Sequence, residues 1–299
     1  MKNKGYFLVL STAIISGFSI FLNKFAVSVS NPYVFTFSKN ILVALFLTAV
    51  LMIFKDYKIL KSLNKKQWAI LVVIGLIGGS IPFLLFFKGL SMASAAGASF
   101  IQKTMFVWIF ILASIFLKEK IFTRHIAAGL ALLGGNLLLL KFSDIRLDAG
   151  SGLIFVATLF WAVENVISKH TIKELPARII MWSRMFFGSV FILIFLAFTH
   201  QLVLLENVNM QQLGWTAITS VLLFGYVYTW YTGIKYIKIS EAAIILMLGS
   251  PVTTALSSIF AKPATLKEYL AMLFIVGGVL TAFLANKIAE KFKQIYVRS

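Results

Sequence analysis

Ionisable residues inside long apolar segments are the side chains of this sequence most able to carry chemistry. Each costs about 2.5–3.5 kcal/mol to insert in a bilayer, so each needs a reason to be there. Glu164 lies in the middle of the apolar segment 150–171, and Lys103 lies about a third of the way into 93–116. Glu164 would carry a coupling proton or bind a substrate amine, and Lys103 would hold a carboxylate or phosphate. Alternatively, the two form one structural ion pair.

Two further cations occupy matched positions. Lys39 and Arg184 each lie about two turns inside an apolar segment, 33–54 and 178–200. They are candidates for gate residues or anion contacts, and snorkelling towards the headgroups is the alternative. Lys24 and Lys169 lie nearer to segment ends, where interface anchoring is the expected role.

Polar and aromatic neighbours complete a candidate substrate-binding set. Aromatic rings with a few fixed polar groups suit an amphipathic organic substrate better than a bare inorganic ion. The set comprises Lys39, Gln102, Lys103, Trp161, Glu164, Asn165, Trp182, Arg184 and Tyr228.

Composition and segment length determine which elements must position these residues. The 299 residues are 60% hydrophobic and 13% charged, whereas a soluble domain carries about 25% charged residues. Continuous apolar runs long enough to cross the bilayer predict an all-α membrane protein with ten transmembrane helices. The expected spans are 5–28, 33–54, 67–88, 93–116, 122–141, 150–171, 178–200, 211–234, 241–261 and 266–287.

The basic residues predict orientation. The net charge of +18 comes from lysines and arginines in short connections, with about 19 at one set of segment ends and about 5 at the other. The positive-inside rule then places both termini in the cytoplasm of a multi-pass protein of the cytoplasmic (inner) membrane. This explains the charge without a nucleic-acid partner.

The two halves of the chain look related at a spacing of about 145 residues. Lys24 matches Lys169, Lys39 matches Arg184, and Gly89 matches Gly233 at nearly the same offset. We expect a first repeat over 1–144 and a second over 145–299. Because each repeat holds five helices, an odd number, the second is expected to insert inverted relative to the first.

With these features the chain resembles the drug/metabolite transporter superfamily, and within it the EamA-type branch. The resemblance rests on the five-plus-five helices, on the fourth segment running into 115–120, and on a glycine-rich fifth segment. It implies transport of amino acids, other small metabolites or drugs, often outward. Two departures suggest unequal halves: no acidic residue matches Glu119 in 260–264, and the fourth segment lacks the proline that the ninth has at Pro251.

The predicted function is therefore secondary transport of a small organic metabolite, such as an amino acid, by alternating access. Protons are the candidate coupling ion, with Glu164 as carrier, and no cofactor or metal is expected. An amino acid would place its amine on Glu164 and its carboxylate on Lys103, whereas the excess of buried cations favours a carboxylate or phosphate. The alternative is a translocase of a lipid-linked, phosphate-bearing substrate. An enzyme is not expected, because no paired acids or metal triad lie within the spans. Substrate, direction and oligomeric state stay open.

Overall fold

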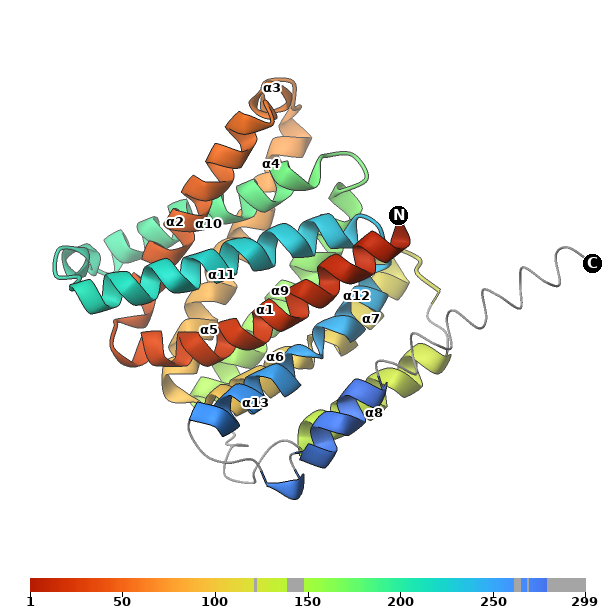
Figure 1. The fold of residues 1–299 in the computed structure, drawn as a ribbon. Coiled ribbons are helices and arrows are strands. Elements are labelled where there is room, and N and C mark those ends of the chain that lie inside the picture. The colour runs from red at the N-terminus through yellow and green to blue at the C-terminus, as the bar shows by residue number, and fades with distance from the viewer. Residues whose placement is uncertain (121–122, 139–147, 261–264, 268, 279–299) are drawn as a thin grey trace, which may run out of the picture.

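The computed structural model describes residues 1–120, 123–138, 148–260, 265–267 and 269–278, and in these ranges the regular structure is helical throughout. Figure 1 shows the helices gathered into one bundle, with α8 (Thr123–Leu138) towards one end. The other elements are α1 Lys2–Ser28, α2 Pro32–Ile53, α3 Tyr57–Leu60, α4 Lys65–Ile74, the π-helix η1 Gly75–Ser80, α5 Ile81–Met92, α6 Ala95–Lys103, α7 Met105–Phe116, α9 Ala149–Thr171, α10 Ala177–Phe198, the 3-10 helix η3 Leu202–Leu205, α11 Met210–Ile234, α12 Ile239–Leu246 and α13 Gly249–Phe260.

Seven helices in the described part of the chain are long and apolar enough to cross a membrane. They correspond to seven of the ten predicted spans. The eighth long helix, α11, has 25 residues, but its threonine, tyrosine and tryptophan residues lower its mean hydropathy. The predicted spans 122–141 and 266–287 are described only in part, as α8 and an apolar helix over Tyr269–Gly278. The prediction of ten spans and the side of the C-terminus therefore stay predictions.

Glycines bring the long helices together in two pairs, and each pair joins a helix of the first half of the chain to a helix of the second half. α1 packs against α11, where a Cβ on Gly5 would lie 3.1 Å from the Gly233 carbonyl oxygen. α9 packs against α5, where a Cβ on Gly89 would lie 2.6 Å from the Gly150 carbonyl oxygen. Figure 1 shows α1 and α11 running side by side. Small residues allow this close approach in the absence of a hydrophobic driving force in lipid.

Capping boxes start corresponding helices in the two halves of the chain. A capping box formed by Asn64 and Gln67 starts α4, and one formed by Asn209 and Gln212 starts α11. Each box satisfies two main-chain N–H groups that a helix start would leave unpaired. The two boxes are 145 residues apart.

Lys24 and Lys169 bind helix ends rather than lipid headgroups, which corrects the expectation of interface anchoring. The Lys24 ammonium donates to the carbonyl oxygens of Leu90 at 2.9 Å and Ala93 at 2.7 Å, at the end of α5. The Lys169 ammonium donates to the carbonyl oxygens of Ile234 and of Ile237, at the end of α11. Both lysines satisfy carbonyls that have no partner within the helix and oppose the negative end of its dipole.

Replacing Lys24 with methionine is therefore expected to lower the free energy of unfolding by about 1–3 kcal/mol, because charge-assisted bonds to helix-end carbonyls are lost. Thermal unfolding of purified protein in detergent measures the change. The control is Lys65→Met, at an exposed position in the first turn of α4, which is expected to change stability by less than about 0.5 kcal/mol. Equal losses in the two variants would exclude the capping role.

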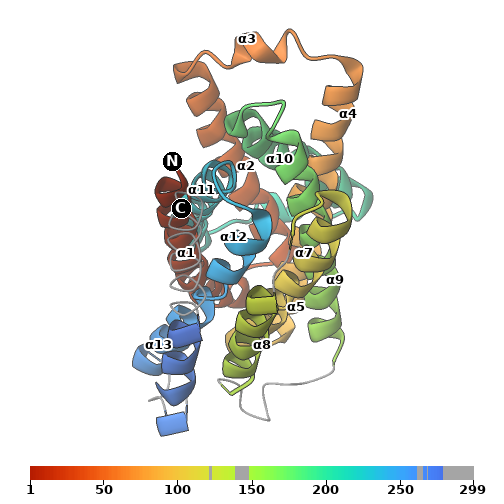
Figure 2. The same cartoon turned by 90° about the vertical axis from the view of Figure 1, so that its right-hand side faces the viewer.

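Two spans are broken near their centres, and the breaks face each other. α6 ends and α7 begins at Thr104, whose hydroxyl donates to the Ile101 carbonyl oxygen at 2.7 Å. α12 and α13 are separated by residues 247–248, directly before Gly249, the first residue of α13. Lys103 lies at the first break, and a Cβ on Gly249 at the second would lie 3.1 Å from its Nζ. Figure 2 shows α12 near the middle of the bundle and α13 lower in the view. The first break forms without the missing proline because a threonine hydroxyl competes for a helix carbonyl.

Candidate functional site

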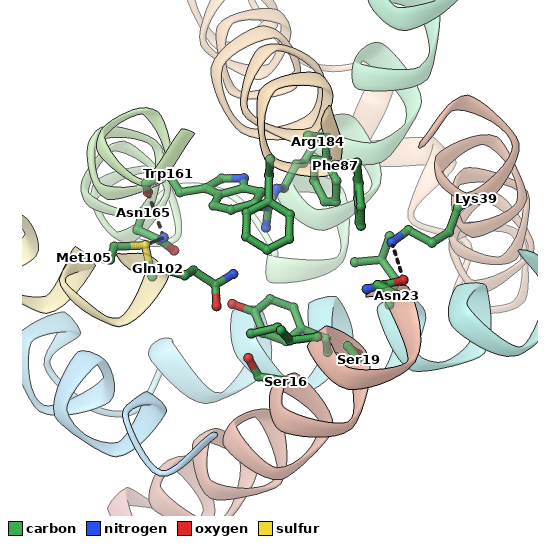
Figure 3. Close-up of a pocket in the computed structure, with 15 residues that line it drawn as sticks. Ser16, Ser19, Asn23, Lys39, Phe87, Gln102, Met105, Trp161, Asn165 and Arg184 are labelled. Atoms are coloured by element: carbon green, nitrogen blue, oxygen red, sulfur yellow. Dashed lines mark hydrogen bonds between the residues drawn. The ribbon is translucent and has the colours of Figure 1, made fainter. Parts of the chain in front are cut away.

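A pocket lies among the helices, lined by residues of α1, α2, α5, α6, α7, α9, α10 and α11. Its cavity volume is about 60 Å³, well below the roughly 300–1,000 Å³ of a typical small-molecule site, so the pocket is nearly closed in this conformation. In Figure 3, Lys39 and Asn23 lie on one side, Trp161, Asn165 and Met105 lie on the other, and Gln102 lies between. The lining residues are Ser16, Ser19, Ile20, Asn23, Lys39, Phe83, Phe86, Phe87, Gln102, Met105, Trp161, Asn165, Arg184, Leu223 and Tyr226.

Lys39 is held in the wall of this pocket by an amide and by aromatic rings. The residue is 1% exposed, and its Nζ donates to Asn23 Oδ1 at 3.3 Å. The same Nζ lies 3.8 Å from the centre of the Phe87 ring and 5.9 Å from that of Phe83. Cation–π attraction strengthens when the cation is desolvated. In the described residues no carboxylate forms an ion pair with Lys39, so an ammonium donor is left for a ligand.

Arg184 is joined to Glu164 through a tyrosine. Arg184 Nη1 donates to the Tyr231 hydroxyl at 3.4 Å, and this hydroxyl donates to Glu164 Oε1 at 2.5 Å. Ser168 Oγ donates to the same carboxylate oxygen at 2.5 Å. Glu164 is 0% exposed, and its Oε2 has no hydrogen-bond partner among the described residues. The acid is not part of the pocket lining and lies behind Arg184 and Tyr231.

The π-helix η1 supplies carbonyl oxygens that position two site residues. Gly78 O accepts from Trp161 Nε1 at 3.0 Å and from Arg184 Nε at 3.2 Å. Gly79 O accepts from Asn40 Nδ2 at 3.0 Å. A π-helical turn disturbs the regular hydrogen-bond ladder and is frequent at functional sites. Here the available carbonyls orient Trp161 on α9 and Arg184 on α10.

Lys103 lies at the break between α6 and α7 and binds neutral partners. Its Nζ donates to Ser16 Oγ at 3.0 Å and to Gln102 Oε1 at 3.2 Å. Within the described residues it forms no ion pair with Glu164, whose Oε1 is taken by Tyr231 and Ser168. The structural Lys103–Glu164 pair is therefore not formed in this conformation. Lys103 is 2% exposed and lies beside the pocket, next to the lining residues Ser16 and Gln102.

The amide of Asn165 joins the tryptophans on one side of the pocket. Its Oδ1 accepts from Trp230 Nε1 at 2.6 Å, and its Nδ2 donates to the Trp161 carbonyl oxygen at 2.8 Å. The Trp161 ring packs edge-on against Phe83, with centroids 5.4 Å apart. This aromatic wall is thus fixed by hydrogen bonds at its polar edges.

Two of the predicted site residues lie away from the pocket. Trp182 donates from Nε1 to Thr48 Oγ1 at 2.9 Å and stacks on Phe186 between α2 and α10. Tyr228 packs against Phe224 on another face of α11, and Tyr226 lines the pocket instead. The structure brings five predicted residues into the lining: Lys39, Gln102, Trp161, Asn165 and Arg184.

The sequence prediction missed the α1 wall of the pocket. Ser16, Ser19 and Asn23 lie on the lining, and Asn23 is the hydrogen-bond partner of Lys39. Their spacing of three and four residues places them on one face of a helix. These three polar residues on one face of an otherwise apolar span were the sequence signal that could have predicted this wall of the pocket.

No group of three or more His, Asp or Glu residues that could hold a metal ion occurs in the ranges that the structure describes.

Known proteins with similar sequences are named as transporters. The sequence matches the EamA-like transporter family over residues 3–141 and again over 148–284. It is 27% identical to the uncharacterized transporter YyaM of Bacillus subtilis over 93% of this chain and 92% of that one. It is 29% identical to the riboflavin transporter ImpX of Fusobacterium nucleatum over 66% of this chain and 69% of that one. A crystal structure of a protein with 17% sequence identity has the same fold, with a TM-score of 0.75 over 95% of this chain and 98% of that one.

A helical bundle with several spans long and apolar enough to cross a membrane is typical of a multi-pass membrane protein, and the sequence matches place it among transporters. The chain belongs to the EamA-like transporter family, in agreement with the resemblance found in the sequence. The family match falls separately on each half of the chain.

Proposed function

We propose that the protein is a secondary active transporter that exports or exchanges a small organic metabolite, such as an amino acid, across the cytoplasmic membrane. The observation that carries this proposal is the buried pocket of cations, amides and aromatic rings next to two facing helix breaks. Discontinuous helices near the centre of the bilayer are a recurring feature of transporter substrate sites. Alternating access would expose the pocket to one side of the membrane at a time.

The proposed architecture is two inverted repeats, 1–144 and 145–299, with both termini in the cytoplasm. The matched capping boxes, the two lysines bound to helix ends and the breaks at Thr104 and at 247–248 support it. α1 and α9 then occupy equivalent places, as do α5 and α11. The pocket lies between these pairs, where relative movement of the halves would open and close it.

Glu164 is the proposed proton carrier rather than a direct ligand for the substrate. It is fully buried behind Arg184, and its Oε2 is without a partner among the described residues. A buried acid in a span faces the protein interior and is a common component of proton relays. Binding and release of a proton there would alter the contact between Tyr231 and Arg184, and Arg184 lines the pocket.

Counterflow uptake into proteoliposomes tests the proposal. The panel comprises amino acids, organic anions, sugar phosphates, amphipathic cations and riboflavin, the last because one relative is a riboflavin transporter. We expect saturable uptake of at least one compound by the unmodified protein. Glu164→Gln and Lys103→Met are each expected to reduce this uptake at least about tenfold, a loss equivalent to about 1.4 kcal/mol.

The matched control is Lys65→Met, which removes a lysine from an exposed helix start and should leave uptake unchanged. No uptake of any soluble compound by well-folded protein would exclude the proposal and point to the alternative, a lipid-linked substrate with a phosphate. The cavity between α4, α7 and α9 gives that alternative little support. Its lining of Ile70, Leu112, Phe116, Leu117, Val163, Val166, Ile167, His170 and Thr171 contains no lysine or arginine.

A further inference from the structure

Two polar clusters of the same design flank the pocket, one in each half of the chain. The first contains Lys39 with Ser19, Asn23 and Phe87, and the second contains Arg184 with Glu164, Ser168 and Tyr231. Lys39 and Arg184 are 145 residues apart, as are Ser19 and Glu164, and Asn23 and Ser168. Phe87 and Tyr231 are 144 residues apart. Each cluster therefore has a cation on the second span of its half, an aromatic ring on the third, and polar residues on the first.

The most consequential difference between the clusters is the counter-ion. In the second cluster, Glu164 accepts from Tyr231, which in turn accepts from Arg184. In the first cluster, serine replaces the glutamate and phenylalanine replaces the tyrosine. Lys39 is consequently left with Asn23 Oδ1 and the Phe87 ring. An ammonium group buried without a counter-ion is costly, so the first cluster is electrostatically incomplete.

Unused polar groups at the first cluster face the pocket. Ser19 Oγ is buried and has no hydrogen-bond partner among the described residues, and Ser19 is part of the pocket lining. The Phe83 ring lies between the two cations, with its centre 5.9 Å from Lys39 Nζ and 5.5 Å from Arg184 Cζ. A molecule of metabolite size that reaches Lys39 therefore also lies against aromatic rings.

We propose that Lys39, with Ser19 and Asn23, is the anion subsite of the pocket. A carboxylate or phosphate of the substrate binds beside Lys39, in the position equivalent to that of the Glu164 carboxylate beside Arg184. The inference rests on the proposed transport function and narrows it to amphipathic organic anions. The anionic group binds Lys39 by charge-assisted hydrogen bonds, and the apolar part packs on Phe83, Phe86 and Trp161. A substrate with only a positive charge is rejected, because the pocket already contains uncompensated Lys39.

Binding of four matched probes to the full-length protein in lipid nanodiscs tests this subsite. The probes are 3-phenylpropionate, phenyl phosphate, 3-phenylpropionamide and phenethylamine, which share a ring and differ in charge. We expect at least one anion to bind at least about tenfold more tightly than the amide and the amine. A preference between the two anions identifies the carboxylate or the phosphate as the natural group.

Three variants connect the binding to the cluster. Ser19→Glu supplies the counter-ion that the first cluster lacks, so it should weaken anion binding at least about tenfold, while Ser19→Gln, of equal size but neutral, should weaken it less than about threefold. Lys39→Met should also remove the preference for anions. Unfolding temperatures measured in parallel establish that each variant is folded. If Ser19→Glu does not fold, the loss of anion preference in Lys39→Met tests the anion subsite instead.

The outcomes separate this inference from the proposed function. Equal binding of amine and anion, failure of all four probes to bind, or equal effects of Ser19→Glu and Ser19→Gln would each overturn the anion subsite. Anion binding that depends on Lys39 without counterflow would keep the subsite and exclude transport. Counterflow of cations alone would keep the transporter and exclude the subsite.

Discussion

Replacing Arg184 with methionine is expected to lower the free energy of unfolding by about 3–5 kcal/mol, the cost of leaving one member of a buried charge pair without the other. Arg184 is 4% exposed and Glu164 is 0% exposed, and the Tyr231 hydroxyl joins them. Without the arginine, the Glu164 carboxylate keeps two hydrogen bonds but loses the positive charge of Arg184, which offsets its burial. Thermal and denaturant unfolding in detergent micelles measure the loss.

A second substitution separates the charge from the packing. The double variant Arg184→Met with Glu164→Gln removes both charges and should recover about half or more of the lost stability. The stability effects of substitutions at neighbouring, interacting residues do not simply add. Transport should not recover, because the proposed proton carrier is also absent. A double variant no more stable than Arg184→Met alone would show that Glu164 and Arg184 are not energetically coupled.

The matched control is an ion pair that water can reach. Arg178 binds Asp56 through its guanidinium, and the Arg178 side chain is 34% exposed. Arg178→Met is expected to cost less than Arg184→Met, because water reaches the guanidinium side of this pair, although the Asp56 side chain is 6% exposed. The difference between the two arginines therefore measures the effect of burial.

The spans and the buried cations could be predicted because both follow from local sequence. An apolar run of about 20 residues is sufficient to indicate a membrane-crossing helix. An ionisable residue inside such a run is expected to face the protein interior, and Lys103 and Glu164 are buried in agreement with this rule. Lys39 and Arg184, for which snorkelling was the alternative, are buried as well. Neither inference needs knowledge of the partner helices.

The orientation of aromatic residues could not be predicted in the same way. α11 carries Tyr226, Tyr228, Trp230 and Tyr231, which are distributed around most of the helix. Successive residues in a helix are rotated by about 100°, so Tyr226 and Tyr228 point in nearly opposite directions. Only the packing of α11 decides that Tyr226 reaches the pocket. Trp182 was misplaced for the same reason: its partner Thr48 is on another helix.

The π-helix was beyond local prediction because its hydrogen-bond partners are remote in sequence. A proline can kink a helix, but Pro82 follows the six residues of η1 and does not lie among them. The carbonyl oxygens of Gly78 and Gly79 accept from Trp161, Arg184 and Asn40. The altered ladder is thus stabilised by donors on three other helices. Repeated glycines favour close helix packing, but their spacing does not indicate which side chains will reach the exposed carbonyl oxygens.

Replacing Gly79 with alanine is expected to prevent stable folding, with a loss of at least about 3 kcal/mol, because overpacking against rigid atoms cannot be relieved. A Cβ on Gly79 would lie 1.8 Å from the Arg184 carbonyl oxygen, and one on Gly188 would lie 2.5 Å from Gly79 O. These neighbours are main-chain atoms, so relief requires η1 and α10 to separate. Expression level and unfolding temperature in detergent measure the effect.

The control makes the same glycine-to-alanine substitution at a position where the added methyl group has room. A Cβ on Gly152 in α9 would have nothing within 4 Å, so Gly152→Ala should leave stability unchanged or raise it by up to about 1 kcal/mol, as helix propensity favours alanine. A folded Gly79→Ala protein would still distinguish two roles for the glycine. If separation of η1 from α10 moves Gly78 O away from Trp161 and Arg184, uptake falls although the fold survives. Normal stability together with normal uptake would show that the contact between η1 and α10 is not required to build the site.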